Sequence, residues 1–107
     1  MKFTLTQPCA NCPFRTDVRP YLTKNRAKEI AHAITEQQRT FTCHKTLKLD
    51  EEDRQHCGGA LILLEKLNQP NQMMRLEERF GCYDRRKLKM DAPVFDTTKQ
   101  FIKVNNS

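Results

Sequence analysis

Tryptophan is absent from this sequence, glycine occurs only three times, and no long apolar run is present. The longest apolar run, residues 60–64, is far shorter than the roughly 20 residues that a membrane-spanning helix needs. No apolar segment follows residues 1–4, so we expect no secretory signal. These absences together predict a soluble, cytoplasmic protein with no membrane partner.

Apolar residues are also scarce, at 37% of the 107 residues. This length corresponds to one domain, residues 1–107, and a core of that size often needs a metal ion or disulfides to be stable. The chain has five cysteines. In a reducing compartment they favour metal binding or redox chemistry over structural disulfides.

The alternation of strands and helices that indicates a parallel sheet is missing as well. Helical spacing of apolar residues predicts helices over 23–38, 57–68 and 71–80, the first capped by Thr23. The second is apolar nearly all round, which places it in the core. A last short helix is expected after Asp96, which would cap it.

Two short stretches, 2–6 and 40–46, have the alternation or the threonine content of strands. In the third predicted helix, Met73, Leu76 and Phe80 share one face. The sequence therefore predicts a mostly α (small α+β) domain. It would have three to four helices and a short two-stranded element, stapled by a four-cysteine metal site.

The cysteines carry the strongest functional pattern. Cys9, Cys12, Cys43 and Cys57 form one group, with thirty residues between the second and third and thirteen between the third and fourth. The first two lie in the proline-bounded stretch PCANCPFR, and Cys57 opens the apolar helix, where free backbone N–H groups favour a thiolate. Four thiolates from three segments would hold a small core together around a metal. Cys82 has no partner at ligand spacing and is expected to be a half-buried free thiol.

Other interpretations of the cysteines are a disulfide framework, a redox dithiol at Cys9 and Cys12, and unconnected buried thiols. The odd number of cysteines and the expected compartment disfavour disulfides. A thioredoxin-type dithiol opens a helix, whereas Pro13 follows this pair and no helical pattern begins before Thr23. Metal ligation is therefore the favoured interpretation.

The identity of the metal stays open at this point. Zn²⁺ is the usual occupant of a four-cysteine site, but such sites draw on two tight pairs, whereas this pattern is two plus one plus one. A Cys-Pro step and distant single cysteines also occur around iron–sulfur clusters. We expect Zn²⁺, with a 4Fe-4S cluster as the alternative.

Three polar residues adjoin the cysteines. His44 and His56 each follow or precede one, and Arg15 follows the first pair. Either histidine can hydrogen-bond a ligand sulfur, replace a thiolate, or simply be solvated. Arg15 can neutralise part of the −2 charge that four thiolates leave on Zn²⁺. We expect these residues to support the site rather than to bind the metal.

Basic residues outnumber acidic ones, with 19 Lys and Arg against 13 Asp and Glu. The excess of basic residues lies in 1–48 and 71–107, while acidic residues outnumber basic ones in 49–70, where residues 50–53 form an acidic run. Cations beside Tyr83 suit phosphate contact and base stacking. The residues predicted to contact nucleic acid are Arg85, Arg86, Lys87 and Lys89, with Lys24, Arg26 and Lys28 at the start of the first helix. The alternative partner is an acidic surface on a protein.

The stretches CANCPFR, FTCHKT and CGGALILLEK cover about a quarter of the chain. Together they resemble a group of small uncharacterised bacterial and phage proteins with the pattern Cys-x-x-Cys-Pro-aromatic-Arg, then Cys-His, then Cys-x-Gly. The resemblance implies a shared four-cysteine site with Arg15 and His44 near it, and it brings no established activity.

A closed set of four thiolates leaves no open coordination position for a substrate. The sequence shows no catalytic triad, phosphate loop or paired carboxylates. We therefore expect a binding or regulatory module for nucleic acid rather than an enzyme. A redox or catalytic iron–sulfur protein, and an inhibitor that docks on a host enzyme, are the alternatives.

Overall fold

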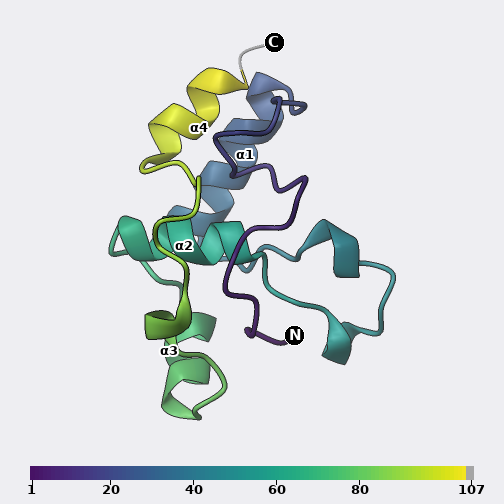
Figure 1. Cartoon of the computed structure of the whole chain (residues 1–107), viewed down its shortest axis with the longest axis vertical. Coiled ribbons are helices and arrows are strands. Elements are labelled where there is room, and N and C mark those ends of the chain that lie inside the picture. The colour runs from purple at the N-terminus through teal and green to yellow at the C-terminus, as the bar shows by residue number, and fades with distance from the viewer. Residues whose placement is uncertain (106–107) are drawn as a thin grey trace.

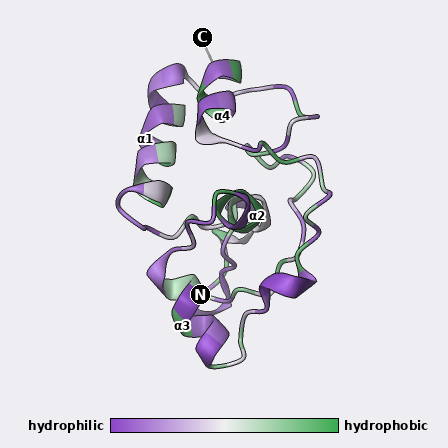
Figure 2. Cartoon of the chain, turned by 90° about the vertical axis from the view of Figure 1, so that its left-hand side faces the viewer, coloured by the Kyte–Doolittle hydropathy of each residue, from purple (hydrophilic) through white to green (hydrophobic). Residues whose placement is uncertain are grey.

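In the computed structural model, which describes residues 1–105, α2 (Gly58–Lys66) lies at the centre of the molecule. Residues Ala60 to Leu64 are completely buried, because alanine, leucine and isoleucine occupy every side of this helix. Figure 2 looks along α2 and shows the rest of the chain arranged around it. The prediction of a central, all-round apolar helix is confirmed.

The other helices lie on two sides of α2. Helices α1 (Lys24–Thr35) and α4 (Thr98–Val104) pack against each other at one end of the long axis, and α3 (Gln72–Arg79) lies at the other end (Figure 1). Three short 3-10 helices, η1 (His44–Thr46), η2 (Glu51–Asp53) and η3 (Arg85–Lys87), interrupt the connecting loops. The described chain is thus compact and mostly helical, as the sequence predicts, and none of its helices has the length and apolar character to cross a membrane.

Side-chain caps set the starts of three helices. The hydroxyl of Thr23 accepts from the backbone N–H of Arg26, and the side chain of Asn71 accepts from that of Met74. Both starts agree with the sequence. The expected cap Asp96 is wrong by one residue: Thr97 caps α4, while the Asp96 carboxylate is paired with Lys66 Nζ at 3.0 Å.

The expected two-stranded element is not formed. Residues 40–46 contain a single bridge at Thr42 and then turn into η1, because both the N–H and the hydroxyl of Thr46 bond back to the carbonyl of Cys43. Residue 2 likewise forms only one bridge, to Gln55. Both stretches lie along residues 54–57 instead of pairing with each other, so 54–57 is a central extended segment with a neighbour on each side.

Candidate metal centre

The PCANCPFR stretch folds into two consecutive turns that direct its thiols inward. The N–H of Cys12 donates to the carbonyl of Cys9 at 3.2 Å, and the N–H of Arg15 donates to the carbonyl of Cys12 at 3.1 Å. The Arg15 guanidinium also donates to the Cys9 carbonyl at 3.3 Å and forms a bidentate salt bridge with the Asp17 carboxylate. As a result Cys12 is completely buried, while Cys9 is half-buried.

The extended segment 54–57 brings the other two cysteines to this turn. Cys43 donates its N–H to the carbonyl of Gln55 at 2.8 Å, and Cys57 donates its N–H to the carbonyl of Phe41 at 2.7 Å. Both cysteines are buried, and Cys57 is the residue from which α2 starts. The N–H groups of Gly59 and Ala60 in the first turn of α2 favour negative charge on this sulfur, but they offset only part of the effect by which the Cys12 hydrogen bond and burial raise the pKa of Cys57.

The closest sulfurs come from distant parts of the chain. Cys12 Sγ and Cys57 Sγ lie 3.5 Å apart, although 45 positions separate them in sequence. Gly59 makes this approach possible, since a Cβ on it would stand 2.5 Å from Cys12 Sγ. Gly58 is equally constrained, because a Cβ there would stand 2.3 Å from the carbonyl oxygen of Gln7. The two glycines therefore let the cysteine turn rest directly on the first turn of α2.

The thiols influence one another electrostatically. The hydrogen bond between Cys57 and Cys12 raises the pKa of Cys57, with burial adding to the effect, and lowers that of Cys12, so the shared proton stays on Cys57. Burial raises the pKa of Cys9, and negative charge on Cys12 or Cys43 raises it further. All four thiols thus belong to one electrostatic neighbourhood, in which a bound cation would relieve the repulsion between thiolates.

The sulfurs do not form a closed tetrahedron. Among residues 1–105, no three cysteine sulfurs lie within 4.8 Å of one another. The arrangement is one tight pair, Cys12 and Cys57, with Cys9 and Cys43 at its edge. Cys82 is fully separate and exposed, with its thiol 3.8 Å from the carbonyl of Phe80, rather than half-buried as expected.

His56 is completely buried and supports the backbone around the thiols rather than a sulfur. Its Nε2 accepts from the N–H of Phe41 and faces Asn71 Nδ2, each at 3.3 Å, and its Nδ1 donates to the carbonyl of Cys57 at 3.1 Å. Burial lowers its pKa to about 4, which keeps the ring neutral. His44 is exposed in η1 beside Cys43.

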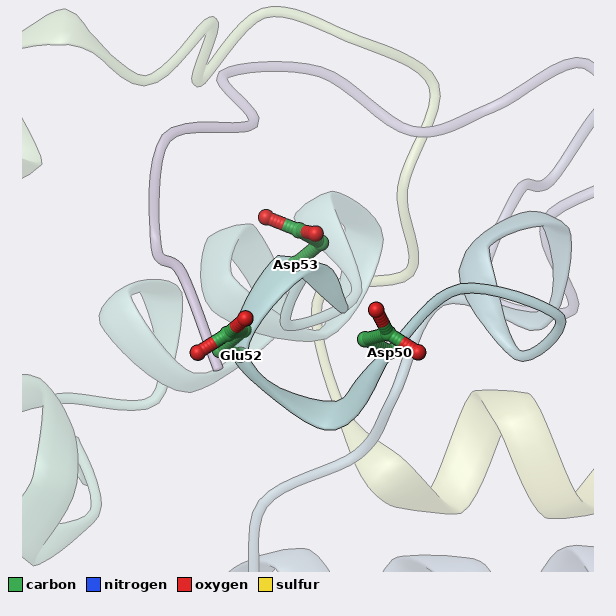
Figure 3. Close-up of side chains that lie close together, drawn as sticks. All are labelled: Asp50, Glu52 and Asp53. Carbon is green, nitrogen blue, oxygen red and sulfur yellow. The ribbon is translucent and has the colours of Figure 1, made fainter.

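The acidic run forms a second group of possible metal ligands. Carboxylate oxygens of Asp50, Glu52 and Asp53 lie within 4.8 Å of one another at η2, and all three residues are exposed (Figure 3). Asp53 is also 3.4 Å from Lys2 Nζ. Solvated carboxylates of this kind need no ion, and the buried thiols make the stronger candidate centre.

The basic residues predicted to contact nucleic acid do not form one surface. Lys24, Arg26 and Lys28 belong to α1, whereas η3, with Arg85, Arg86 and Lys87, lies toward the α3 end of the long axis (Figure 1). The backbone N–H of Lys89 donates to the carbonyl of Thr6 at 2.8 Å. Local acids hold three of the arginines: Arg26 lies 3.1 Å from Glu29, Arg85 3.5 Å from Glu78 and Arg86 3.0 Å from Asp84.

The structure also changes which aromatic ring is available at the basic end. Tyr83 is only 4% exposed, so the expected stacking on it is wrong. Phe80 is 71% exposed at the end of α3, because Met74 is the α3 side chain that enters the core. At the opposite end, Lys24 shares a shallow apolar hollow with Lys99, Ile102 and Lys103 of α4. Lys24 lies far from Lys99 and Lys103 in sequence, so the sequence alone does not indicate this group of lysines.

Comparison with known proteins adds a family. No curated protein and no solved structure matches the chain. A family model described as a family of unknown function, DUF6283, matches residues 4–107, which include every cysteine. The chain therefore belongs to the DUF6283 family.

Proposed function

We propose that the protein is a metal-binding domain in which Cys9, Cys12, Cys43 and Cys57 hold a single metal centre. The observation that carries this proposal is the 3.5 Å contact between the sulfurs of Cys12 and Cys57 on the buried side of the site. Cysteines that merely fill the core would need neither this contact between sulfurs nor a glycine at position 59, whose missing Cβ leaves room for Cys12 Sγ.

The contact favours one ion over a cluster. A zinc–sulfur bond of about 2.3 Å gives a tetrahedron whose sulfurs are about 3.8 Å apart, close to the observed pair. In a 4Fe-4S cluster each thiolate binds a different iron, which keeps the sulfurs farther apart. Zn²⁺ is therefore the proposed occupant, with Cys9 and Cys43 moving inward to complete its shell.

The proposed role of the centre is structural. It would join three parts of the chain: the cysteine turn, the segment before η1 and the start of α2. Such a centre adds its binding free energy to the stability of the fold. Four thiolates would also leave no open position for catalysis.

Metal analysis of protein purified without oxygen tests the proposal. We expect one zinc per chain and no visible absorption, whereas a brown protein with iron and sulfide would establish the cluster. Cys12→Ser and Cys57→Ser should lose the metal, and Cys82→Ser is the matched control that should keep it. Protein that contains no stoichiometric metal of either kind would refute the centre.

A second candidate function is nucleic-acid binding by a surface that we call the α3–η3 surface. It consists of Arg79, Phe80, Arg85, Arg86, Lys87 and Lys89. The observation that favours it is the 71% exposure of Phe80 at the end of α3, the residue after Arg79, because an exposed ring can stack on a base while cations contact phosphates. Binding of single-stranded oligonucleotides that weakens steeply with salt would support it, and salt-independent binding would favour a protein partner.

A further inference from the structure

We propose that oxidation of the metal centre by a hydroperoxide ends in a disulfide between Cys12 and Cys57, which removes two ligands and releases the metal. This inference rests on the proposed function for the release of metal, but the choice of cysteines rests on geometry alone. A Cys-x-x-Cys pair is expected to oxidise within itself, so the pairing distinguishes this fold from a dithiol enzyme.

The sulfur geometry selects the pair. A zinc tetrahedron would hold all of its sulfur pairs about 3.8 Å apart, so the selection acts once oxidation of Cys9 has opened the tetrahedron. In the structure, Cys12 Sγ is 3.5 Å from Cys57 Sγ, and a small inward movement of the two sulfurs brings them to the bond length of about 2.05 Å. Both residues are buried, at 0% and 3% exposure, so a dithiol reduces the product more slowly than it would an exposed disulfide. The hollow at Gly59 lets the sulfur of Cys12 lie against α2.

Exposure determines where the oxidant enters. Cys9 is half-buried, whereas Cys43 and the close pair are buried, so a hydroperoxide meets Cys9 first. The Cys9 thiol takes one oxygen from the hydroperoxide and becomes a sulfenic acid, releasing an alcohol or water. The Cys12 thiol attacks this sulfur, water leaves, and a Cys9–Cys12 disulfide forms.

The last step is thiol–disulfide exchange. The sulfur of Cys57 attacks that of Cys12, the Cys12–Cys57 bond forms, and Cys9 leaves as a thiol with the proton that Cys57 gives up. Counted on free thiols, the net change converts two thiols and one hydroperoxide into a disulfide, an alcohol and water; for metal-bound thiolates, solvent supplies the two protons. Reduction by a dithiol reverses it and restores the four ligands.

The experiment uses the full chain with Cys82→Ser, which removes the exposed thiol and its intermolecular disulfides. The native, metal-loaded protein is treated with hydrogen peroxide until thiol loss stops, alkylated, and digested for peptide mapping. We expect two of the four remaining thiols to be lost, a peptide linking Cys12 to Cys57, and metal in the filtrate after ultrafiltration. Dithiothreitol and added metal should restore both.

A matched pair of variants tests the relay. Cys57→Ser should stop at the Cys9–Cys12 disulfide, whereas Cys43→Ser should still yield the Cys12–Cys57 bond, with circular dichroism checking that each is folded. A Cys9–Cys12 or Cys43-containing disulfide as the endpoint of the parent protein, or sulfinic acid without any disulfide, overturns the inference without need of a variant.

Failure of this inference is separable from failure of the proposed function. A metal-loaded protein with another endpoint disulfide keeps the centre and removes the pairing. Protein that never binds metal but links Cys12 to Cys57 removes the centre and keeps the pairing.

Discussion

The cysteine centre and the α3–η3 surface are built in opposite ways. The centre gathers side chains from three distant segments into the interior, and each is positioned by backbone hydrogen bonds such as those of Cys43 and Cys57 to residues 55 and 41. The α3–η3 surface is a local stretch of exposed cations, two of which are already paired with local acids. Four cysteines from distant segments come together only if the whole fold places them there, whereas a local run of charged residues is common on any protein surface. The cysteine centre is therefore the better guide to function.

Removing the metal should give the largest difference between the two regions. Chelation by EDTA at neutral pH should lower the melting temperature by at least 10 °C, because several kcal/mol of ligand binding are lost and each kcal/mol corresponds to about 4–8 °C in a domain of this size. Calorimetry with and without added zinc measures it. Adding oligonucleotide without metal should not restore the loss, and an unchanged melting temperature would make the centre dispensable.

Gly59→Ala should have the next largest effect. The new Cβ would stand 2.5 Å from Cys12 Sγ and 3.2 Å from the Cβ of Phe14. Overpacking of this kind costs about 1–3 kcal/mol, and displacement of the sulfur should also weaken metal binding. Denaturant unfolding and zinc competition measure the two effects.

Gly81→Ala is the control for that substitution. Gly81 has a φ of +76° but no atom within 4 Å of an added Cβ. Alanine there should lower stability through backbone strain and leave zinc affinity unchanged. Equal zinc affinities for the two variants would contradict the close fit of the cysteine turn on α2.

His56→Phe should destabilise the centre's backbone support by about 1–3 kcal/mol, because the N–H of Phe41 and the amide of Asn71 lose their buried acceptor. His44→Phe is the matched exposed control and should change stability by less than about 0.5 kcal/mol. Urea unfolding of both variants measures the difference, and equal effects would show that the His56 hydrogen bonds are unimportant.

The smallest effects on stability are expected on the α3–η3 surface. Lys87→Gln should leave unfolding unchanged and reduce the slope of log affinity against log salt by about 0.7–0.9 for one lost phosphate contact. Fluorescence anisotropy with a labelled oligonucleotide at several salt concentrations measures this. Lys28→Gln, in α1 at the other end, is the control that should not alter the slope.

Local signals in the sequence were enough to predict the helices. Thr23 and Asn71 have the side-chain oxygens that cap helices, and the all-round apolar pattern of residues 57–68 already identifies the central helix. The predicted cap of α4 is wrong because Asp96 and Thr97 are both residue types that cap helices. Only the fold shows that the Asp96 carboxylate pairs with Lys66.

The site was harder to predict, because spacing cannot show which sulfurs meet. Cys9 and Cys12 are the closest cysteines in sequence, yet the contact is between Cys12 and Cys57. The role of His56 depends on partners at positions 41 and 71, and the exposure of Phe80 depends on which face of α3 the rest of the fold covers. Each of these is a tertiary fact that no local pattern encodes.

The burial of α2 also sets how fast different parts of the molecule exchange their amide hydrogens. Residues Ala60 to Leu64 have no contact with solvent on any side, so their amides can exchange only when the whole domain opens. The amides of η1 and η2 lie on exposed loops and can exchange through local opening. Exchange rates in α2 therefore report the global stability of the domain, and those at Cys57, where helix and centre meet, should be the first to slow when an ion is added.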